Sequence, residues 1–278
     1  MNRYFLAYST ANDDPTFLAD YLNFVNMTIY LPGVSSIEVF IAISEVIPIT
    51  PLQQKIISAL KDRLTSCCWL NVHKIIYKSN VGRDFSSAHA CLNEISKIAK
   101  KEDYVMVKNR SGYGPIKSSW YKAYIEQYNK LTSEGLVGST INFDYYKRIS
   151  KNEIFTHVQS YIYLTKFKVI APLILKFPGI TCIDQDSLIY HGEIALSKYI
   201  LKNGMQLSCL HWPNHIFDKK NPTDPLLPQG DIKGSVKDVP FRHRFRNYFR
   251  YPDHLLLLLK WQIRIMIRKI CNKYFDMK

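Results

Sequence analysis

The chain has 278 residues and a formal net charge of +14, which comes from 37 Lys and Arg against 23 Asp and Glu. Hydrophobic residues make up 47% of it and no long polar tract is present, which excludes a largely disordered chain. The six cysteines form no CxxC pair and have no spacing suited to a zinc site, so we expect reduced thiols. Neither a secretory signal nor an uncharged apolar stretch of about 18 residues is visible. We therefore expect a globular protein that folds on the cytoplasmic side of a membrane.

Up to about residue 142, short apolar runs alternate with longer segments of helical periodicity. This alternation is typical of βαβ units in a largely parallel sheet. The predicted strands are Tyr4–Tyr8, Ile37–Ile43, Leu70–Tyr77, Tyr104–Val107 and Gly135–Ile141. The predicted helices run from Asp13 to about Asn26, from Pro51 to about Leu64, from Phe85 to Lys100 and from about Ser118 to Leu131. The predicted fold class is α/β, with a Rossmann-like layer.

The second half is less regular. A strand or helix is predicted around Val158–Leu164, helices at about Phe167–Lys176 and Glu193–Lys202, and a strand at Met205–Leu210. Residues 213–240 hold five of the thirteen prolines, which indicates a linker or the border of an active site. We accordingly divide the chain into a main domain at 1–212, this proline-rich segment, and a basic segment at 241–278.

The first candidate site lies between a predicted strand and a predicted helix, where open α/β sheets bind ligands. It comprises Asn80, Gly82, Arg83 and Asp84. Gly82 allows the backbone to approach a ligand, the Arg83 guanidinium can pair with a phosphate, and Asp84 can accept hydrogen bonds from a ribose or a base. The structural alternative is a turn glycine followed by a helix-capping aspartate.

The second candidate site follows the apolar strand that ends at Val107. It comprises Lys108, Asn109, Arg110 and Ser111, a position that suits contact with a diphosphate. Many sugar-nucleotide enzymes carry a metal-binding Asp-x-Asp there. Because Asn109 and Ser111 flank Arg110 instead, a divalent ion such as Mg²⁺ or Mn²⁺ is a doubtful cofactor, and Lys108 or Arg110 can supply the positive charge. The structural alternative is a tight turn with solvated charges.

Two further segments offer groups for sugar binding and proton transfer. Asn142, His157 and Gln159 carry donors and acceptors that can orient the hydroxyls of a sugar, although His157 alone suits a structural role equally. Glu193 opens a predicted amphipathic helix, where the helix dipole stabilises a carboxylate that can act as a general base. The alternative for Glu193 is a helix-start residue without chemistry.

Together these segments resemble the glycosyltransferases of capsule, O-antigen and rhamnan synthesis, including enzymes like rhamnan-synthesis protein F. The resemblance spans about residues 4–210. It rests on Asn80–Asp84, Asn109–Pro115, Gly138–Asn142, His157–Ser160 and Glu193–Gly204 in register.

The resemblance implies a GT-A fold and transfer of a hexosyl or pentosyl group from a nucleotide sugar to a growing surface glycan, on a lipid-linked or polysaccharide acceptor. The Glu193 helix is similar to the Glu-Asp helix of many such enzymes, but Ile194 stands where their Asp often lies. Arg110 also departs from the pattern, which puts metal dependence in doubt.

The last 37 residues contain ten Lys and Arg against two Asp. A helix predicted from about His254 to Tyr274 combines apolar residues with a basic set that suits an anionic membrane surface. That set is Lys260, Arg264, Arg268, Lys269 and Lys273. We expect a peripheral protein on the inner face of the cell membrane, and the alternative is a helix packed on the domain with a solvated basic face.

The sequence thus predicts a membrane-associated glycosyltransferase that binds a nucleotide sugar. A nucleic-acid-binding protein is the chief alternative because of the charge of +14. No helix-turn-helix, zinc-finger or aromatic RNA-binding motif supports it, so no nucleic-acid partner is expected. The second alternative is a catalytically inactive scaffold at the membrane, which the missing Asp-x-Asp allows.

Overall fold

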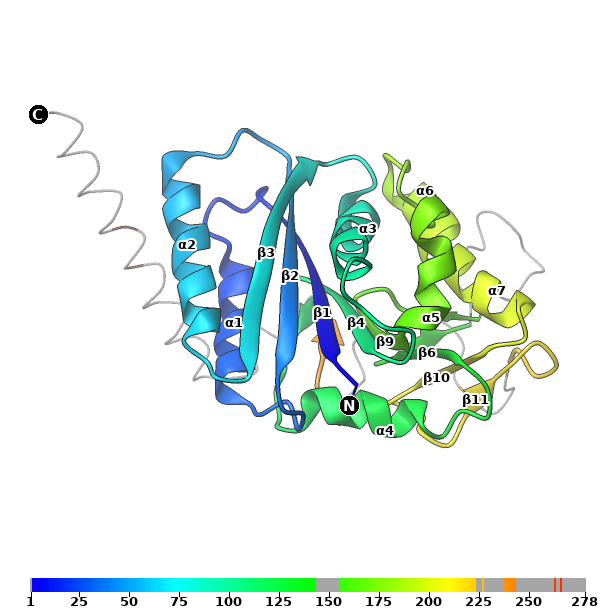
Figure 1. The fold of residues 1–278 in the computed structure, drawn as a ribbon. Coiled ribbons are helices and arrows are strands. Elements are labelled where there is room, and N and C mark those ends of the chain that lie inside the picture. Colours follow the sequence, from blue (N-terminus) through cyan, green and yellow to red (C-terminus); the bar gives the residue numbers. More distant parts are fainter. Residues whose placement is uncertain are drawn as a thin grey trace, which may run out of the picture.

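A computed structural model describes residues 2–143, 156–223, 227, 238–243, 263 and 266. A central sheet carries helices on both faces (Figure 1). Its strands are β1 (Tyr4–Ala11), β2 (Ile37–Glu45), β3 (Leu70–Ser79), β4 (Tyr104–Asn109), β6 (Gly135–Gly138), β9 (Ile162–Lys166), β10 (Gln206–Cys209) and β11 (Ile216–Phe217). Shorter strands form two ribbons, β5 (Gly112–Tyr113) with β12 (Arg242–His243) and β7 (Ile141–Asn142) with β8 (His157–Val158). The helices are α1 (Leu18–Ile29), α2 (Pro51–Thr65), α3 (Arg83–Ile95), α4 (Trp120–Tyr128), α5 (Phe167–Ile170), α6 (Gln185–Leu188) and α7 (Ala195–Lys202), with a 3₁₀ helix η1 (Ala171–Lys176) and a π-helix η2 (Ile189–Ile194).

The strand order is β11-β10-β6-β9-β4-β1-β2-β3. Strands β3, β2, β1 and β4 are mutually parallel, β9 runs antiparallel to β4 and β6, and β10 is parallel to β6. The predicted α/β, Rossmann-like class is therefore confirmed. Because the chain proceeds from β1 to β2 and β3 on one side and returns to β4 on the other, the strand order reverses between β1 and β4. The carboxyl end of such a reversal is where open α/β sheets form a ligand-binding crevice.

Both faces of the sheet are buried along β1, β2 and β4, which explains the near-continuous apolar runs of these strands, whereas the edge strand β3 keeps several exposed residues. Alternate residues of β1 enter opposite halves of the core. Leu6 and Tyr8 pack towards α1, α2 and α4, whereas Phe5 and Ala7 pack towards α3, α5 and α7. This period of two follows from the pleat of a strand.

Two helix starts show how local side chains set the boundaries. Helix α2 begins with a capping box, in which Thr50 and Gln53 satisfy each other's backbone amides before Pro51 opens the helix. Helix α1 was predicted to begin at Asp13 but begins at Leu18. The Asp14 carboxylate accepts from the Leu18 amide and holds a turn ahead of the helix.

The second half departs from the sequence prediction in its helices. The helix predicted to begin at Glu193 begins at Gln185, where the Asp184 side chain accepts from the Ser187 amide at 2.8 Å and caps it. The helical stretch then passes through η2 into α7 without a break. Glu193 therefore lies inside a π-helical turn, so the argument that a helix dipole stabilises its carboxylate is wrong.

The described parts of the segment after residue 212 pack against the domain. Strand β11 extends the sheet beside β10, and β12 pairs with β5. Phe241 is fully buried and contacts the rings of Trp120 and Tyr124. The predicted membrane-surface residues Lys260, Arg264, Arg268, Lys269 and Lys273 lie outside the described residues. In the described part of the chain, no helix combines the length and apolarity needed to cross a bilayer.

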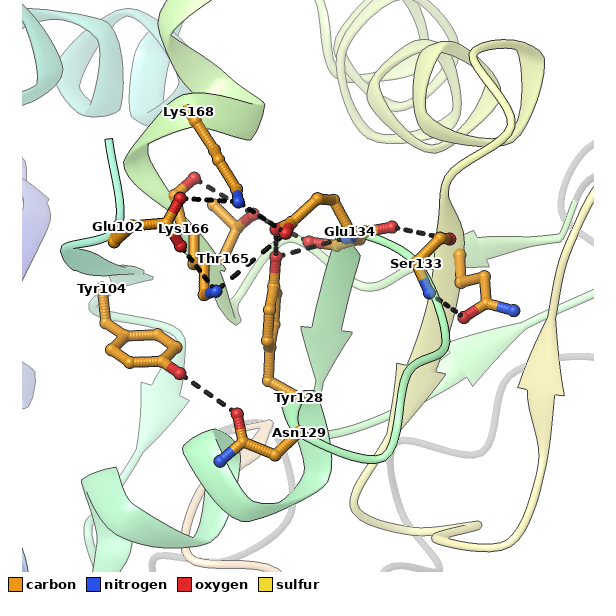
Figure 2. Close-up of polar contacts among 11 residues, drawn as sticks. Glu102, Tyr104, Tyr128, Asn129, Ser133, Glu134, Thr165, Lys166 and Lys168 are labelled. Atoms are coloured by element: carbon orange, nitrogen blue, oxygen red, sulfur yellow. Dashed lines mark hydrogen bonds and ion pairs between the residues drawn. The ribbon is translucent and has the colours of Figure 1, made fainter.

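The amino edge of the parallel strands is closed by ion pairs (Figure 2). Lys168 Nζ lies 2.7 Å from carboxylate oxygens of both Glu102 and Glu134, and Lys166 Nζ lies 2.8 Å from Glu102. The Tyr128 hydroxyl donates a hydrogen bond to Glu134, which links α4 to the start of β6. This amino-edge network joins the ends of β4, β6 and β9 opposite the crevice.

Candidate functional site

A cleft of about 500 Å³ opens at the carboxyl edge of the sheet. The ends of β1, β2 and β4 form its floor through Thr10, Ser44 and Asn109. The start of α3 forms one wall, and the residues before β9 together with α6 and η2 form the other. The cleft lies at the strand-order reversal between β1 and β4, where the topology predicts a binding site.

The first predicted segment contributes directly to this cleft. Asn80, Arg83 and Asp84 line it. Gly82 does not, because it forms the turn behind the wall. Its φ is +71°, its amide donates to Cys182 O at 2.9 Å, and a Cβ at this position would lie 2.3 Å from Ile180 O.

Arg83 is the cation of this segment. Its backbone has φ of +43°, an uncommon conformation for a residue other than glycine. Its positive charge opposes the rise in pKa that burial causes at the adjacent Asp84 carboxyl, and the residue lines the cleft.

Asp84 connects α3 with the turn after β4. Asn109 Nδ2 donates to Asp84 Oδ2 at 2.6 Å, and Asn109 Oδ1 accepts from the Ser111 amide at 2.9 Å. Burial raises the pKa of the Asp84 carboxyl, and the nearby Glu193 charge raises it further. Asp84 is not a helix cap, because the residue before the helix is Gly82.

Arg110 and Ser111 line the cleft, but the charge of Arg110 is already compensated. Its guanidinium makes a two-point contact with the Asp13 carboxylate and donates to Ala11 O at 3.0 Å. The turns after β1 and β4 are therefore held together across the mouth of the cleft. A phosphate would have to compete with Asp13 for Arg110.

Lys108 was predicted at the diphosphate site, and the structure places it elsewhere. Its side chain is fully buried, its Nζ donates to Asn109 O at 3.2 Å, and it lies 4.7 Å from the centre of the Tyr8 ring. Burial lowers the pKa of the Lys108 ammonium. The reason is the alternation along β4, which turns Lys108 to the same core face as Met106.

Glu193 faces the cleft from η2. Its Oε2 accepts from Ser160 Oγ at 2.7 Å, and its Oε1 lies 3.4 Å from His157 Nε2. Its side chain remains 13% exposed, whereas His157 is fully buried behind it. The preceding Gly192 packs so tightly on Phe85 that a Cβ would lie 2.9 Å from the ring. The π-helical turn thus fixes the carboxylate at the cleft surface, and such turns occur frequently at functional sites.

The other predicted sugar-binding residues divide between the cleft and the core. Gln159 lines the cleft. Asn142 and His157 form a pair in the β7–β8 ribbon, are buried, and do not line it. The burial of these two residues contradicts the prediction that they contact a sugar in the cleft directly, and His157 lies behind Glu193 instead.

Sequence reasoning missed several lining residues. Among them are Ser9, Thr10, Asp13, Ser44, Tyr161 and His243. Polar residues at the ends of apolar strands were the available signal for Ser9, Thr10 and Ser44. Nothing in the sequence places His243 there, because it reaches the cleft through the pairing of β12 with β5.

The described lining of the cleft carries more acidic than basic groups, so the cleft is not strongly positive. Its described lining carries the guanidinium groups of Arg83 and Arg110 and the carboxyl groups of Asp13, Asp84 and Glu193. The described residues contain no group of three His, Cys, Asp or Glu side chains that could hold a metal ion. The arrangement can bind an anion at Arg83, accept a proton at Glu193, and hydrogen-bond hydroxyl groups through its amides and hydroxyls.

No protein-family model and no curated protein matches the sequence. Among solved structures, the fold is similar to 4-diphosphocytidyl-2C-methyl-D-erythritol synthase of Anaerococcus prevotii, with 13% identity over 77% of this chain and 89% of that chain and a TM-score of 0.43. It is also similar to galactosyltransferase LgtC in complex with donor and acceptor sugar analogues, with 13% identity over 76% of this chain and 74% of that chain and a TM-score of 0.43. Mouse xyloside xylosyltransferase 1 has 10% identity over 63% of this chain and 71% of that chain and a TM-score of 0.38. All three TM-scores lie below 0.5, so the functional assignment rests on the cleft of this chain.

Proposed function

We propose that the protein is a glycosyltransferase that moves a sugar from a nucleotide-sugar donor to a growing surface polysaccharide. The observation that carries this proposal is that Arg83, Asn109 and Glu193, from three separate segments of the chain, line one cleft. The cleft lies at the edge of the sheet where α/β proteins bind nucleotides. A cation for a phosphate and a carboxylate for a proton are both present there.

The reaction assigns one role to Arg83 and another to Glu193. Arg83 binds the diphosphate, and Glu193 accepts the proton of the acceptor hydroxyl. The oxygen of that hydroxyl then bonds to the anomeric carbon, while the bond from this carbon to the phosphate oxygen breaks. The nucleoside diphosphate leaves with the electron pair, and Arg83 stabilises the negative charge that develops on it.

A divalent ion does not fit the residues present in the way that an Asp-x-Asp would hold it. Asn109 Oδ1 already accepts a hydrogen bond from the Ser111 amide, and Asn109 Nδ2 donates to the Asp84 carboxylate. No step above depends on a metal. A metal carried by the diphosphate itself is tested by adding Mn²⁺ in the binding assay.

The acceptor and location are the finer parts of the proposal. The resemblance to capsule, O-antigen and rhamnan enzymes supports a lipid-linked or polysaccharide acceptor. The basic composition after residue 241 supports attachment to the inner face of the cell membrane.

A thermal-shift panel tests the binding part of the proposal. The ligands are UDP-glucose, UDP-galactose, GDP-mannose and dTDP-rhamnose, each with and without Mn²⁺. A ligand that binds only the folded state raises stability by about 2.7 kcal/mol at 100 times its Kd. We expect one nucleotide sugar to raise the melting temperature of the wild type and not that of Arg83→Ala, with Lys168→Ala as the matched control at the opposite edge.

A wild-type protein that no nucleotide sugar stabilises would overturn the proposal. An equal shift in Arg83→Ala would remove Arg83 from the diphosphate site. A stabilising ligand must then also be consumed when an acceptor glycan is added, because a protein that binds the ligand without turnover is a scaffold.

A further inference from the structure

A hydrogen bond fixes which way the side-chain amide of Gln159 is turned. It is 1% exposed and lines the cleft. Its Oε1 accepts a hydrogen bond of 2.6 Å from Thr140 Oγ1. The amide nitrogen Nε2 therefore takes the other side of the side chain, away from Thr140.

The contact between Thr140 and Tyr161 takes its direction from the bond between Thr140 and Gln159. The Tyr161 hydroxyl lies 3.1 Å from Thr140 Oγ1. Thr140 has a single hydroxyl proton and gives it to Gln159, because a carbonyl oxygen only accepts. Tyr161 must then donate to Thr140, and the chain of donors runs from Tyr161 through Thr140 to Gln159.

The Gln159 Nε2 group is buried and lacks a hydrogen-bond partner among the residues that the structure describes. A buried polar group without a partner costs about 1–3 kcal/mol. Because Gln159 lines the cleft, a ligand bound there is a partner that can satisfy this donor. The next residue, Ser160, donates to Glu193, and both of these residues line the same cleft as Gln159.

We propose that Gln159 Nε2 donates to an oxygen of the bound sugar, and that Thr140 and Tyr161 are positioning residues that fix this polarity. The inference rests on the proposed function and specifies the sugar side of the donor site. The group recognised is a hydrogen-bond acceptor, namely a hydroxyl or ring oxygen. A sugar that presents only a donor or a methyl group at this point would bind less tightly.

Two substitutions of Gln159 separate donation from acceptance. Gln159→Glu keeps the acceptor that Thr140 needs and replaces the N–H groups with a negatively charged carboxylate oxygen that can only accept, whereas Gln159→Leu removes both polar atoms. Isothermal titration of each variant uses the nucleotide sugar from the panel and its matching nucleoside diphosphate. The quantity measured is the ratio of the two Kd values, which cancels general losses of nucleotide binding.

We expect both variants to lose about tenfold or more of the preference for the nucleotide sugar, with nearly unchanged affinity for the nucleoside diphosphate. Thr140→Val and Tyr161→Phe lose a smaller part of it, because the amide remains but is no longer oriented. A general weakening of the fold would lower both affinities and leave the ratio unchanged.

The inference is overturned if Gln159→Glu keeps the wild-type ratio, since the group facing the sugar would then accept, or if Gln159→Leu keeps it. If Gln159→Leu does not fold, Gln159→Glu decides alone. Failure of the proposed function looks different, because the wild type would then bind neither the nucleoside diphosphate nor its sugar conjugate.

Discussion

The two edges of the central sheet treat charged groups in opposite ways. At the amino edge, Glu102 is paired with Lys166 and Lys168, and these hydrogen bonds lower the pKa of its carboxyl to about 2 (Figure 2). At the carboxyl edge, burial raises the pKa of Asp84, and the Gln159 amide nitrogen has no partner among the described residues. The amino edge pairs its charged groups at the surface, whereas the carboxyl edge holds a partly buried carboxyl and a buried amide nitrogen that has no partner among the described residues.

This difference indicates where the molecule gives up stability for function. Groups with raised pKa values and unsatisfied donors cluster at functional sites, because a ligand or a reaction uses them. Substitutions at the carboxyl edge should therefore change binding and turnover, and those at the amino edge should change stability alone.

The largest effect is expected from Glu193→Gln. General-base catalysis contributes about 10²–10⁴-fold to a rate, so kcat should fall by about that factor. The fold should persist, since the amide can still accept from Ser160. The matched control is Glu134→Gln in the amino-edge network, which should leave kcat unchanged. Equal turnover in Glu193→Gln and wild type would remove Glu193 from the mechanism.

Gly192→Ala should break the support of the carboxyl edge. The added methyl group would lie 2.9 Å from the Phe85 ring, and overpacking of this kind costs about 1–3 kcal/mol. Urea denaturation measures the loss, and a nucleotide-sugar titration should show weakened binding as Glu193 shifts. Adding Phe85→Leu should restore part of the stability, whereas fully additive effects of the two substitutions would refute the contact as the cause.

Asp84→Asn should stabilise the protein at neutral pH. Because folding raises the pKa of this carboxyl, the protein loses stability as pH rises from the ordinary pKa of 3.8 through the pKa in the folded state. The asparagine keeps an oxygen for Asn109 and has no charge to bury. Urea denaturation of both proteins should show a gain at pH 7 that disappears in acid, and a loss at pH 7 would contradict the assigned burial cost.

Glu102→Gln should have the smallest effect and the opposite pH dependence. Its lowered pKa contributes stability that is present above the ordinary value of 4.5 and is lost as pH falls towards 2. The glutamate is exposed, so the loss in Glu102→Gln at pH 7 should be small and should shrink further in 1 M NaCl. A loss of stability as large as that of Gly192→Ala would contradict the proposed difference between the two edges of the sheet.

The sequence predicted the fold correctly where burial determines the pattern of apolar residues. The apolar runs of β1, β2 and β4 and the start of α2 at Pro51 follow from buried strands and a helix cap, and they lie where they were predicted. Helix α1 was placed too early, because the Asp14 turn resembles a cap in sequence. Lys108 was placed at the diphosphate site because it follows the apolar run that ends at Val107, whereas strand β4 continues past it and strand alternation turns it into the core.

The cleft was readable only in part. Arg83, Asn109 and Glu193 follow or lie near sheet ends, so their convergence could be predicted from topology. The π-helical position of Glu193 could not, because its helix starts eight residues earlier at a cap that a loop-like segment conceals. Gln159 was identified by residue type, but its donor polarity depends on Thr140 and Tyr161, which only the packed structure brings together.

Amide hydrogen exchange with a saturating nucleotide sugar tests the central claim most directly, because it reports both edges of the sheet in one experiment. Ligand binding should slow exchange at residues 80–84, 109–113, 159–161 and 189–193, and leave residues 128–135 and 166–168 unchanged. Unaltered exchange around the cleft, or protection confined to the amino edge, would contradict a sugar-nucleotide site at the carboxyl ends of β1 and β4.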